Sequence, residues 1–223
     1  MKNNLLLQSL KKILSGFILI GLLLFLSAGS FRYWNGWLFI AVLFFPMIVM
    51  GIVMLFRSPE LLAKRLDAKE KIDEQKWVVA LSGIMFLAAF VVAGLNFRYS
   101  WHSLPNCLTW IGVVVFLVSY LLYAEVMREN AFLSRTIEIQ ENQKVVDTGL
   151  YGIVRHPMYF ATLLMFLSIP LILGSFTSFI IMLVYVPIIA LRIKNEEKVL
   201  EDGLDGYSEY ILKVRYKVIP FIW

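Results

Sequence analysis

Five long apolar runs, separated by charged segments, dominate the pattern of the chain. They cover residues 13–29, 37–56, 77–97, 106–127 and 158–191. A helix rises about 1.5 Å per residue, so about 20 apolar residues cross a hydrocarbon core of about 30 Å. Each of the first four runs has about this length, and the pattern therefore predicts four membrane-spanning helices.

The fifth run is too long for a single crossing. It holds 34 residues, and Gly174, Ser175 and Thr177 near its middle favour a turn. Two helices of about 16 residues each follow from this division, arranged as a tight transmembrane hairpin or as a re-entrant pair. The predicted fold is an all-α integral membrane protein with about six membrane helices, four spans plus the hairpin.

The composition excludes an ordinary soluble domain. Hydrophobic residues make up 60% of the 223 residues and the mean hydropathy is +0.75, whereas soluble domains contain roughly 45–50% apolar residues. With one cysteine, Cys107, and only two histidines, His102 and His156, we expect neither a disulfide nor a metal site.

Lysine and arginine are distributed unevenly between the predicted loops. Of 21 such residues, 19 lie before the first run, in the 57–76 loop, in the 128–157 segment and after residue 191, and only Arg32 and Arg98 lie in the alternate loops. Cytoplasmic loops accumulate these residues, so both termini are predicted to be cytoplasmic. The net charge of +5 then reflects topology and attraction to anionic lipids rather than nucleic-acid binding.

The 57–76 loop has an amphipathic pattern. It opens with Ser58-Pro59-Glu60, a helix start, and continues with interleaved apolar and charged residues. This pattern predicts a helix on the membrane surface of the cytoplasmic side, with a solvated connector as the alternative.

The tail has a second amphipathic pattern, which Pro220 is expected to end. Its apolar positions recur at helical spacing: Tyr207, Tyr210, Ile211 and Val214. The chain thus divides into N-terminal transmembrane helices, residues 1–127, and a region of connector, hairpin and tail, residues 128–223. Charged segments on both sides of a short hairpin are typical of a site at the membrane interface.

The segment 148–159 is the sharpest local feature. Pro157 stands where a helix begins, because proline suits the first helical position. Arg155 and His156 would then lie at the positive end of that helix, a place suited to an anionic group. The alternative is that both side chains only anchor the chain among lipid headgroups.

Arg192 and Glu196 lie four residues apart, on one face of the helix that leaves the hairpin. A surface ion pair is the simple interpretation. Ionisable groups near membrane depth are, however, candidates for a functional site.

Together these groups suit a zwitterionic cofactor such as S-adenosylmethionine. It needs hydrogen-bond partners for its charged ends and an aromatic or apolar slot for adenine, and the chain supplies Gln140, Tyr151, His156, Tyr159 and Glu196. The sequence has no G-x-G-x-x-G after a strand and no phosphate loop.

Several of these motifs, in this order, resemble the isoprenylcysteine carboxyl methyltransferase family, whose relatives include membrane phospholipid methyltransferases. The resemblance covers roughly the last 90 residues and is carried by Gln140, Lys144-Val145-Val146-Asp147-Thr148-Gly149-Leu150-Tyr151, Arg155-His156-Pro157-Met158-Tyr159, Glu196-Glu197, Tyr207-Ser208-Glu209-Tyr210 and Val218-Ile219-Pro220-Phe221-Ile222.

The resemblance implies S-adenosylmethionine as cofactor, with Arg192 at the carboxylate of the substrate and Glu196 as the second catalytic residue. The cofactor-binding residues that it implies are Gln140, Gln143, Lys144, Val145, Val146, Tyr151, His156, Pro157, Met158, Tyr159 and Glu196. The chain departs from the family pattern at Gln143, where relatives often have histidine, and at Ala161, where many have glycine.

The expected function is methyl transfer to a membrane-embedded, lipid-like acceptor, such as the carboxylate of an isoprenylcysteine, at a site that faces the cytoplasm. Expected partners are this lipid-like substrate and membrane lipids, without nucleic acid. The alternatives are a membrane reductase that uses NADPH, of the sterol-reductase type, and a non-catalytic membrane scaffold.

Overall fold

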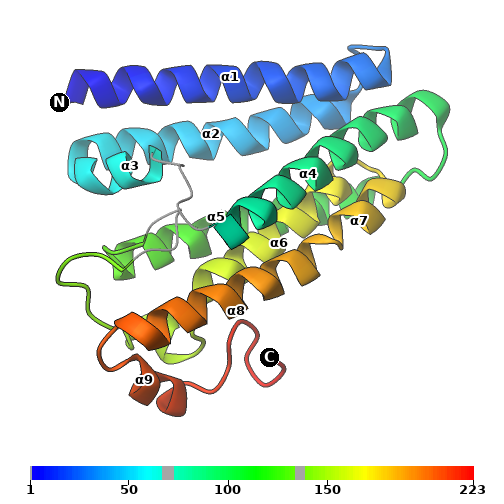
Figure 1. The fold of residues 1–223 in the computed structure, drawn as a ribbon. Helices are drawn as coiled ribbons and strands as arrows, with labels where there is room; N and C mark the ends of the chain where they lie inside the picture. The colour runs from blue at the N-terminus through cyan, green and yellow to red at the C-terminus, as the bar shows by residue number, and fades with distance from the viewer. Residues whose placement is uncertain (1, 67–72, 134–138) are drawn as a thin grey trace.

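The computed structural model describes residues 2–66, 73–133 and 139–223. Figure 1 shows long helices side by side. In chain order the helices are α1 (Lys2–Ala28), α2 (Trp34–Arg57), α3 (Pro59–Leu66), α4 (Asp73–Tyr99), α5 (Asn106–Glu129), the 3-10 helix η1 (Gly149–Gly152), α6 (Pro157–Ile172), α7 (Phe176–Met182), α8 (Tyr185–Gly203) and α9 (Tyr207–Lys213).

Five helical stretches are long and apolar enough to cross a membrane. They are Asn4–Ala28, Trp34–Arg57, Lys76–Tyr99, Asn106–Glu129 and Phe176–Gly203, and α6 is a shorter apolar helix beside them. Large apolar side chains point outward from these helices, with Leu14 60%, Phe45 73% and Ile84 64% exposed. Such surfaces are stable against lipid and not against water, so the prediction of an all-α integral membrane protein is confirmed.

α6 and the stretch formed by α7 and α8 make the predicted hairpin. The chain turns at Gly174, whose φ of +69° lies in the left-handed region that favours glycine. The last carbonyls of α6 lack partners within the helix. Tyr33 Oη donates to Leu173 O at 2.6 Å and Asn35 Nδ2 donates to Ile172 O at 2.7 Å, so α2 holds this end of the hairpin.

The returning arm is longer than the predicted 16 residues. Only two residues separate α7 from α8, and the helical path continues to Gly203, past the predicted end at Leu191. The apolar run ends at Leu191, but the backbone hydrogen bonding does not. Arg192 and Glu196 therefore lie inside one continuous helix, as their spacing predicted.

Two glycines allow the spanning helices to approach closely. A Cβ on Gly94 of α4 would lie 2.7 Å from Leu24 O of α1, and one on Gly112 of α5 would lie 2.9 Å from Leu171 Cβ of α6. Small residues at helix contacts let backbones meet where no hydrophobic effect drives association.

α3 is the described part of the amphipathic helix predicted in the 57–76 loop, and residues 67–72 lie outside the described ranges. Its Leu62 is buried in a small cluster with Leu5, Met54, Leu55 and Met127. Lys12 Nζ of α1 donates to Leu66 O at the end of α3. α3 is thus held against α1, α2 and the end of α5.

The tail helix ends earlier than predicted. α9 stops at Lys213 rather than near Pro220, because the chain becomes extended at Val214. Arg155 N donates to Tyr216 O at 2.9 Å and His156 N donates to Lys217 O at 2.8 Å. Pairing with the segment before α6 therefore replaces the helical hydrogen bonds of the tail.

Candidate functional site

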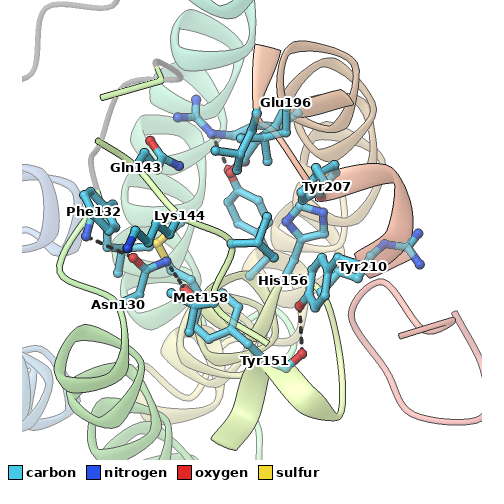
Figure 2. A pocket seen from close by; sticks show the side chains of 18 residues that line it. Asn130, Phe132, Gln143, Lys144, Tyr151, His156, Met158, Glu196, Tyr207 and Tyr210 are labelled. Carbon is cyan, nitrogen blue, oxygen red and sulfur yellow. Dashed lines mark hydrogen bonds between the residues drawn. The ribbon is translucent and has the colours of Figure 1, made fainter. Parts of the chain in front are cut away.

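A pocket lies where α5 and α8 end and α6 begins (Figure 2). Its lining comes from the segment that joins α5 to α6, the first turn of α6, the second half of α8, and α9. The four segments lie up to 80 residues apart in sequence, from Asn130 to Tyr210.

A turn at residues 140–143 begins the polar segment. Gln143 N donates to Gln140 O at 3.1 Å, and Gln140 N donates to Gln143 Oε1 at 2.9 Å. Asn142 has a φ of +57°, which asparagine tolerates. The Gln140 side chain donates to Phe132 O. Gln143, the departure from the family pattern, thus closes the turn that leads residues 144–146 along the pocket.

Gly149 lets the backbone meet the end of α5. Its φ is +56°, and a Cβ there would lie 1.7 Å from Glu129 Oε1. Leu150 N donates to both oxygens of Glu129, at 3.2 and 3.0 Å. Any larger residue would displace this carboxylate, so the Thr148-Gly149-Leu150 motif has a structural reason.

Tyr151 is buried and held at both of its polar groups. Asn130 Nδ2 donates to its hydroxyl at 3.0 Å, and Tyr210 Oη donates to its carbonyl at 2.7 Å, as Figure 2 shows. Burial raises the pKa of Tyr151 and of Tyr210. Both hydroxyls therefore stay protonated near neutral pH.

Glu197 is the centre of a buried charge cluster. Its Oε1 accepts from Arg155 Nε at 2.8 Å and lies 3.2 Å from His156 Nε2, while its Oε2 accepts from Lys217 Nζ at 2.6 Å. Arg155 Nη1 also donates to Val214 O and Arg215 O, at 2.7 and 2.9 Å.

This cluster corrects the interpretation of Arg155 as an anion-binding group. Its guanidinium is occupied by Glu197 and two carbonyls, and its side chain is buried. Arg155 joins the start of α6 to α8 and to the tail. His156 is attached to the same carboxylate, while its ring also borders the pocket.

Tyr159 connects the two residues predicted to be catalytic. Arg192 Nε donates to Tyr159 Oη at 3.1 Å, and Tyr159 Oη donates to Glu196 Oε2. Tyr159 is buried, whereas Arg192 and Glu196 are half-buried. A phenol hydroxyl from α6 therefore sets the relative positions of a cation and an anion on α8, at the pocket wall.

Tyr207 carries a buried hydroxyl that none of the described residues bonds. Its hydroxyl has no hydrogen-bond partner among the described residues, although the side chain lines the pocket and is only 4% exposed as a residue. Burial raises its pKa, so the hydroxyl remains a donor. Buried polar groups are nearly always satisfied, so this hydroxyl is available to bond water or a ligand in the pocket.

The structure brings most of the predicted site residues together. Those that line the pocket are Gln143, Lys144, Val145, Val146, Tyr151, His156, Met158, Tyr159, Arg192 and Glu196. Among the described residues, Gln140 and Pro157 lie outside the lining. Gln140 shapes the turn, and Pro157 is the first residue of α6.

Several lining residues were missed. They are Asn130, Phe132, Leu133, Leu200, Leu204, Tyr207 and Tyr210. A helical signal was available for Leu200, which follows Glu196 by four residues on the same face of α8. The two tyrosines stood in the tail motif that carries the family resemblance, without an assigned role.

The fold and the pocket define a membrane protein of several spans with a polar, aromatic-lined site at one end of its helices. Residues 107–204 match the family model described as phospholipid methyltransferase. The match begins in α5 and ends just before α9, so it contains every predicted site residue but less than half of the chain.

The match supports a membrane methyltransferase that acts on lipid-like substrates, and it does not favour the reductase alternative. It agrees with the motif resemblance at this level, and the narrower isoprenylcysteine family is not singled out by it. A comparison with curated proteins gives no match.

Proposed function

We propose that this protein transfers the methyl group of S-adenosylmethionine to the carboxylate of a lipid-like acceptor, such as an isoprenylcysteine. The observation that carries the proposal is the bridge through Tyr159, which holds Arg192 beside Glu196 at the pocket wall. The phospholipid methyltransferase match over the same residues supports the reaction class. Residues 128–223 would then be the catalytic, cofactor-binding region.

The pocket suits a zwitterionic, adenine-bearing cofactor. Lys144 offers a donor for a carboxylate, and Glu196 offers an acceptor for an ammonium group. Leu200 and Leu204 give an apolar surface beside the aromatic rings. The Tyr207 hydroxyl provides a donor that has no hydrogen-bond partner among the described residues.

S-adenosylmethionine would supply an electrophilic methyl group on a sulfonium ion. Arg192 is proposed to hold the acceptor carboxylate through its planar fork of donors, so that one oxygen faces the methyl carbon. Transfer would form a carbon–oxygen bond and break the carbon–sulfur bond, giving an ester and a neutral thioether. A carboxylate is already ionised near neutral pH, so no general base is required.

The location supports this chemistry. The sulfonium and the carboxylate carry opposite charges, and the products of the transfer are neutral. Bulk water stabilises the charged reactants, so a site with little water favours the reaction. With 19 of 21 lysines and arginines on one side of the predicted topology, that side is proposed to be cytoplasmic, where a water-soluble cofactor enters.

An amine acceptor is the second candidate, because the matching family model is described as phospholipid methyltransferase. An amine must be neutral to attack, and a base must take its proton. Glu196, joined to Tyr159, is the group placed to do so.

One experiment tests the reaction and separates the two acceptors. Membranes that contain the protein are incubated with methyl-labelled S-adenosylmethionine, and the lipid product is treated with alkali. A methyl ester releases its label as methanol, whereas an N-methyl group keeps it. Release supports the carboxylate proposal, retention supports the amine, and absence of labelled lipid contradicts both.

A further inference from the structure

Arg65 of α3 lies beside the pocket wall, although α3 belongs to the N-terminal part of the chain. Its Nη2 lies 3.8 Å from Met158 Sδ, and its Cζ lies 5.3 Å from the centre of the Tyr123 ring. Met158 lines the pocket and precedes Tyr159. Leu133, another lining residue, packs in the apolar cluster that contains Leu62 of α3.

The guanidinium of Arg65 has one donor that no described residue accepts. Its Nε is buried and has no hydrogen-bond partner in the described part of the chain. Within the same residues it forms no ion pair, and its neighbours are a thioether and an aromatic ring. A half-buried cation without an anion is costly, and arginine is the side chain best suited to bind phosphate or carboxylate through two parallel hydrogen bonds.

The contrast with Arg155 strengthens this point. Arg155 has a carboxylate and two carbonyls around its guanidinium, and no donor of its side chain is left buried without a partner. Arg65 contacts Met158 of the pocket lining, and its Nε has no hydrogen-bond partner among the described residues. The arrangement around Arg65 is therefore that of a binding group rather than of a structural one.

The surroundings of Arg65 favour an amphiphile over a free anion. Leu61, Leu66 and Met127 form the apolar cluster at the foot of α3, directly after the spanning helix α2. A cation at the end of a span, above apolar side chains, matches a molecule with an anionic head and an apolar tail.

We propose that Arg65 binds the phosphate or carboxylate oxyanion of a membrane amphiphile at the mouth of the pocket. This part of the inference rests on the proposed function: the amphiphile is the methyl acceptor. It is then a lipid-like acid with a second anionic group besides the reacting carboxylate, which a simple isoprenylcysteine lacks. Arg65 would hold that group while Arg192 holds the reacting carboxylate.

Lipid binding to the purified full-length protein tests the site directly. Native mass spectrometry in detergent measures binding of phosphatidylglycerol, of diacylglycerol, which lacks the phosphate, and of inorganic phosphate. Arg65→Gln is compared with Arg57→Gln, which changes an exposed arginine at the end of α2.

Arg65→Gln is expected to weaken phosphatidylglycerol binding about tenfold or more, whereas Arg57→Gln leaves it unchanged. Arg65→Lys, which keeps the charge and not the planar fork, should lie between them. Equal binding by wild type and Arg65→Gln overturns the proposal. Inorganic phosphate that binds in an Arg65-dependent way while the lipid does not overturns the assignment to an amphiphile.

Methyl transfer separates this inference from the proposed function. Arg65→Gln should raise KM for the acceptor more than it lowers kcat. If wild type binds phosphatidylglycerol through Arg65 but transfers no methyl group, the proposed function fails and the site remains. If transfer occurs and both KM and lipid binding are unchanged in Arg65→Gln, the inference about Arg65 fails alone.

Discussion

The contact between α1 and α4 and the pocket end of the molecule are stabilised in different ways. Gly94 lets α4 approach the backbone of α1 near Leu24, and this packing depends on shape. At the pocket end, the single carboxylate of Glu197 is bonded by three side chains from two other segments. Many apolar side chains can fill the helix packing between α1 and α4, but only a group of opposite charge can pair with Glu197.

The comparison explains where substitutions should do harm. In lipid, the spanning helices have satisfied their own backbone hydrogen bonds, so a changed apolar side chain alters packing alone. Around the pocket, removal of one polar group leaves its partners buried and unpaired. The predictions below test this difference.

Glu197→Gln is expected to have the largest effect. It would leave Arg155, His156 and Lys217 around a neutral amide, and breaking a buried ion pair from one side costs about 3–5 kcal/mol. Thermal unfolding of the purified protein, followed by tryptophan fluorescence, measures this loss. The control is Glu201→Gln, an exposed carboxylate one turn further along α8, and equal melting temperatures of the two variants would contradict the role of the cluster.

Arg192→Ala comes next, and it should act on turnover rather than on folding. Loss of a group that orients the reacting atoms reduces kcat by about 100-fold or more. Arg128→Ala removes an exposed arginine that pairs only with its neighbour on the same helix turn, Glu125, among the described residues. Labelled-methyl transfer by both variants provides the measurement, and normal turnover in Arg192→Ala would exclude the proposed role.

Gly112→Leu tests the packing between the apolar helices α5 and α6. The new side chain would meet Leu171 Cβ at 2.9 Å and Ile172 N at 3.0 Å, and overpacking of this kind costs about 1–3 kcal/mol. Gly83→Leu serves as the control, since a Cβ at Gly83 meets nothing within 4 Å. A lower melting temperature in the first variant alone is the expected result, and the same temperature in both would show that α5 and α6 have room to adjust.

Tyr207→Phe should weaken the binding of the cofactor without lowering the stability of the fold. The hydroxyl has no partner within the described residues, so its removal frees no protein group. Binding of S-adenosylmethionine, measured by calorimetry, should fall about 3- to 10-fold, the worth of one hydrogen bond. Tyr210→Phe should instead lower stability, because Tyr210 Oη donates to Tyr151 O. Unchanged affinity in Tyr207→Phe would count against a ligand contact there.

The smallest effect is expected at the exposed ion pair between Asp147, in the segment that joins α5 to α6, and Lys213 of α9. A hydrogen bond from Lys213 Nζ, at 2.5 Å, holds the pKa of Asp147 below its ordinary value. A lowered pKa in the folded state adds stability above the ordinary pKa of about 3.9, and this contribution is lost as pH falls through the folded value.

Asp147→Asn should therefore be slightly less stable than wild type at neutral pH and equal to it in strong acid. Melting temperatures measured across this pH range provide the test. A difference that persists in strong acid would show that the charge of Asp147 is not its cause.

Hydropathy was sufficient to predict the spans and the hairpin, because each helix needs only enough apolar length. The turn at Gly174 was also predictable from local sequence, because glycine and small polar residues interrupt the apolar run there. The role of Glu197 was not predictable, because neighbouring residues of a helix point about 100° apart, and nothing local shows that Glu197 faces Arg155, His156 and Lys217. Its partner Arg155 lies 42 residues earlier in the chain.

The prediction of where α9 ends was wrong for a related reason. Proline was expected to terminate the helix, but pairing of Tyr216 with Arg155 competes with helical hydrogen bonding from Val214 onward. Such a competition depends on a segment distant in sequence. The proposed site residues followed from motifs that resemble a known family, and the residues that support them did not.

The length of α6 has a consequence for the bilayer itself. Sixteen residues at about 1.5 Å per residue span about 24 Å, less than a hydrocarbon core of about 30 Å. A short span is accommodated by local thinning of the membrane. The headgroup layer would then dip toward the N-terminal end of α6, where the pocket lies. On this account, thicker bilayers should slow methyl transfer, because the acceptor would have to leave its leaflet to reach Arg192.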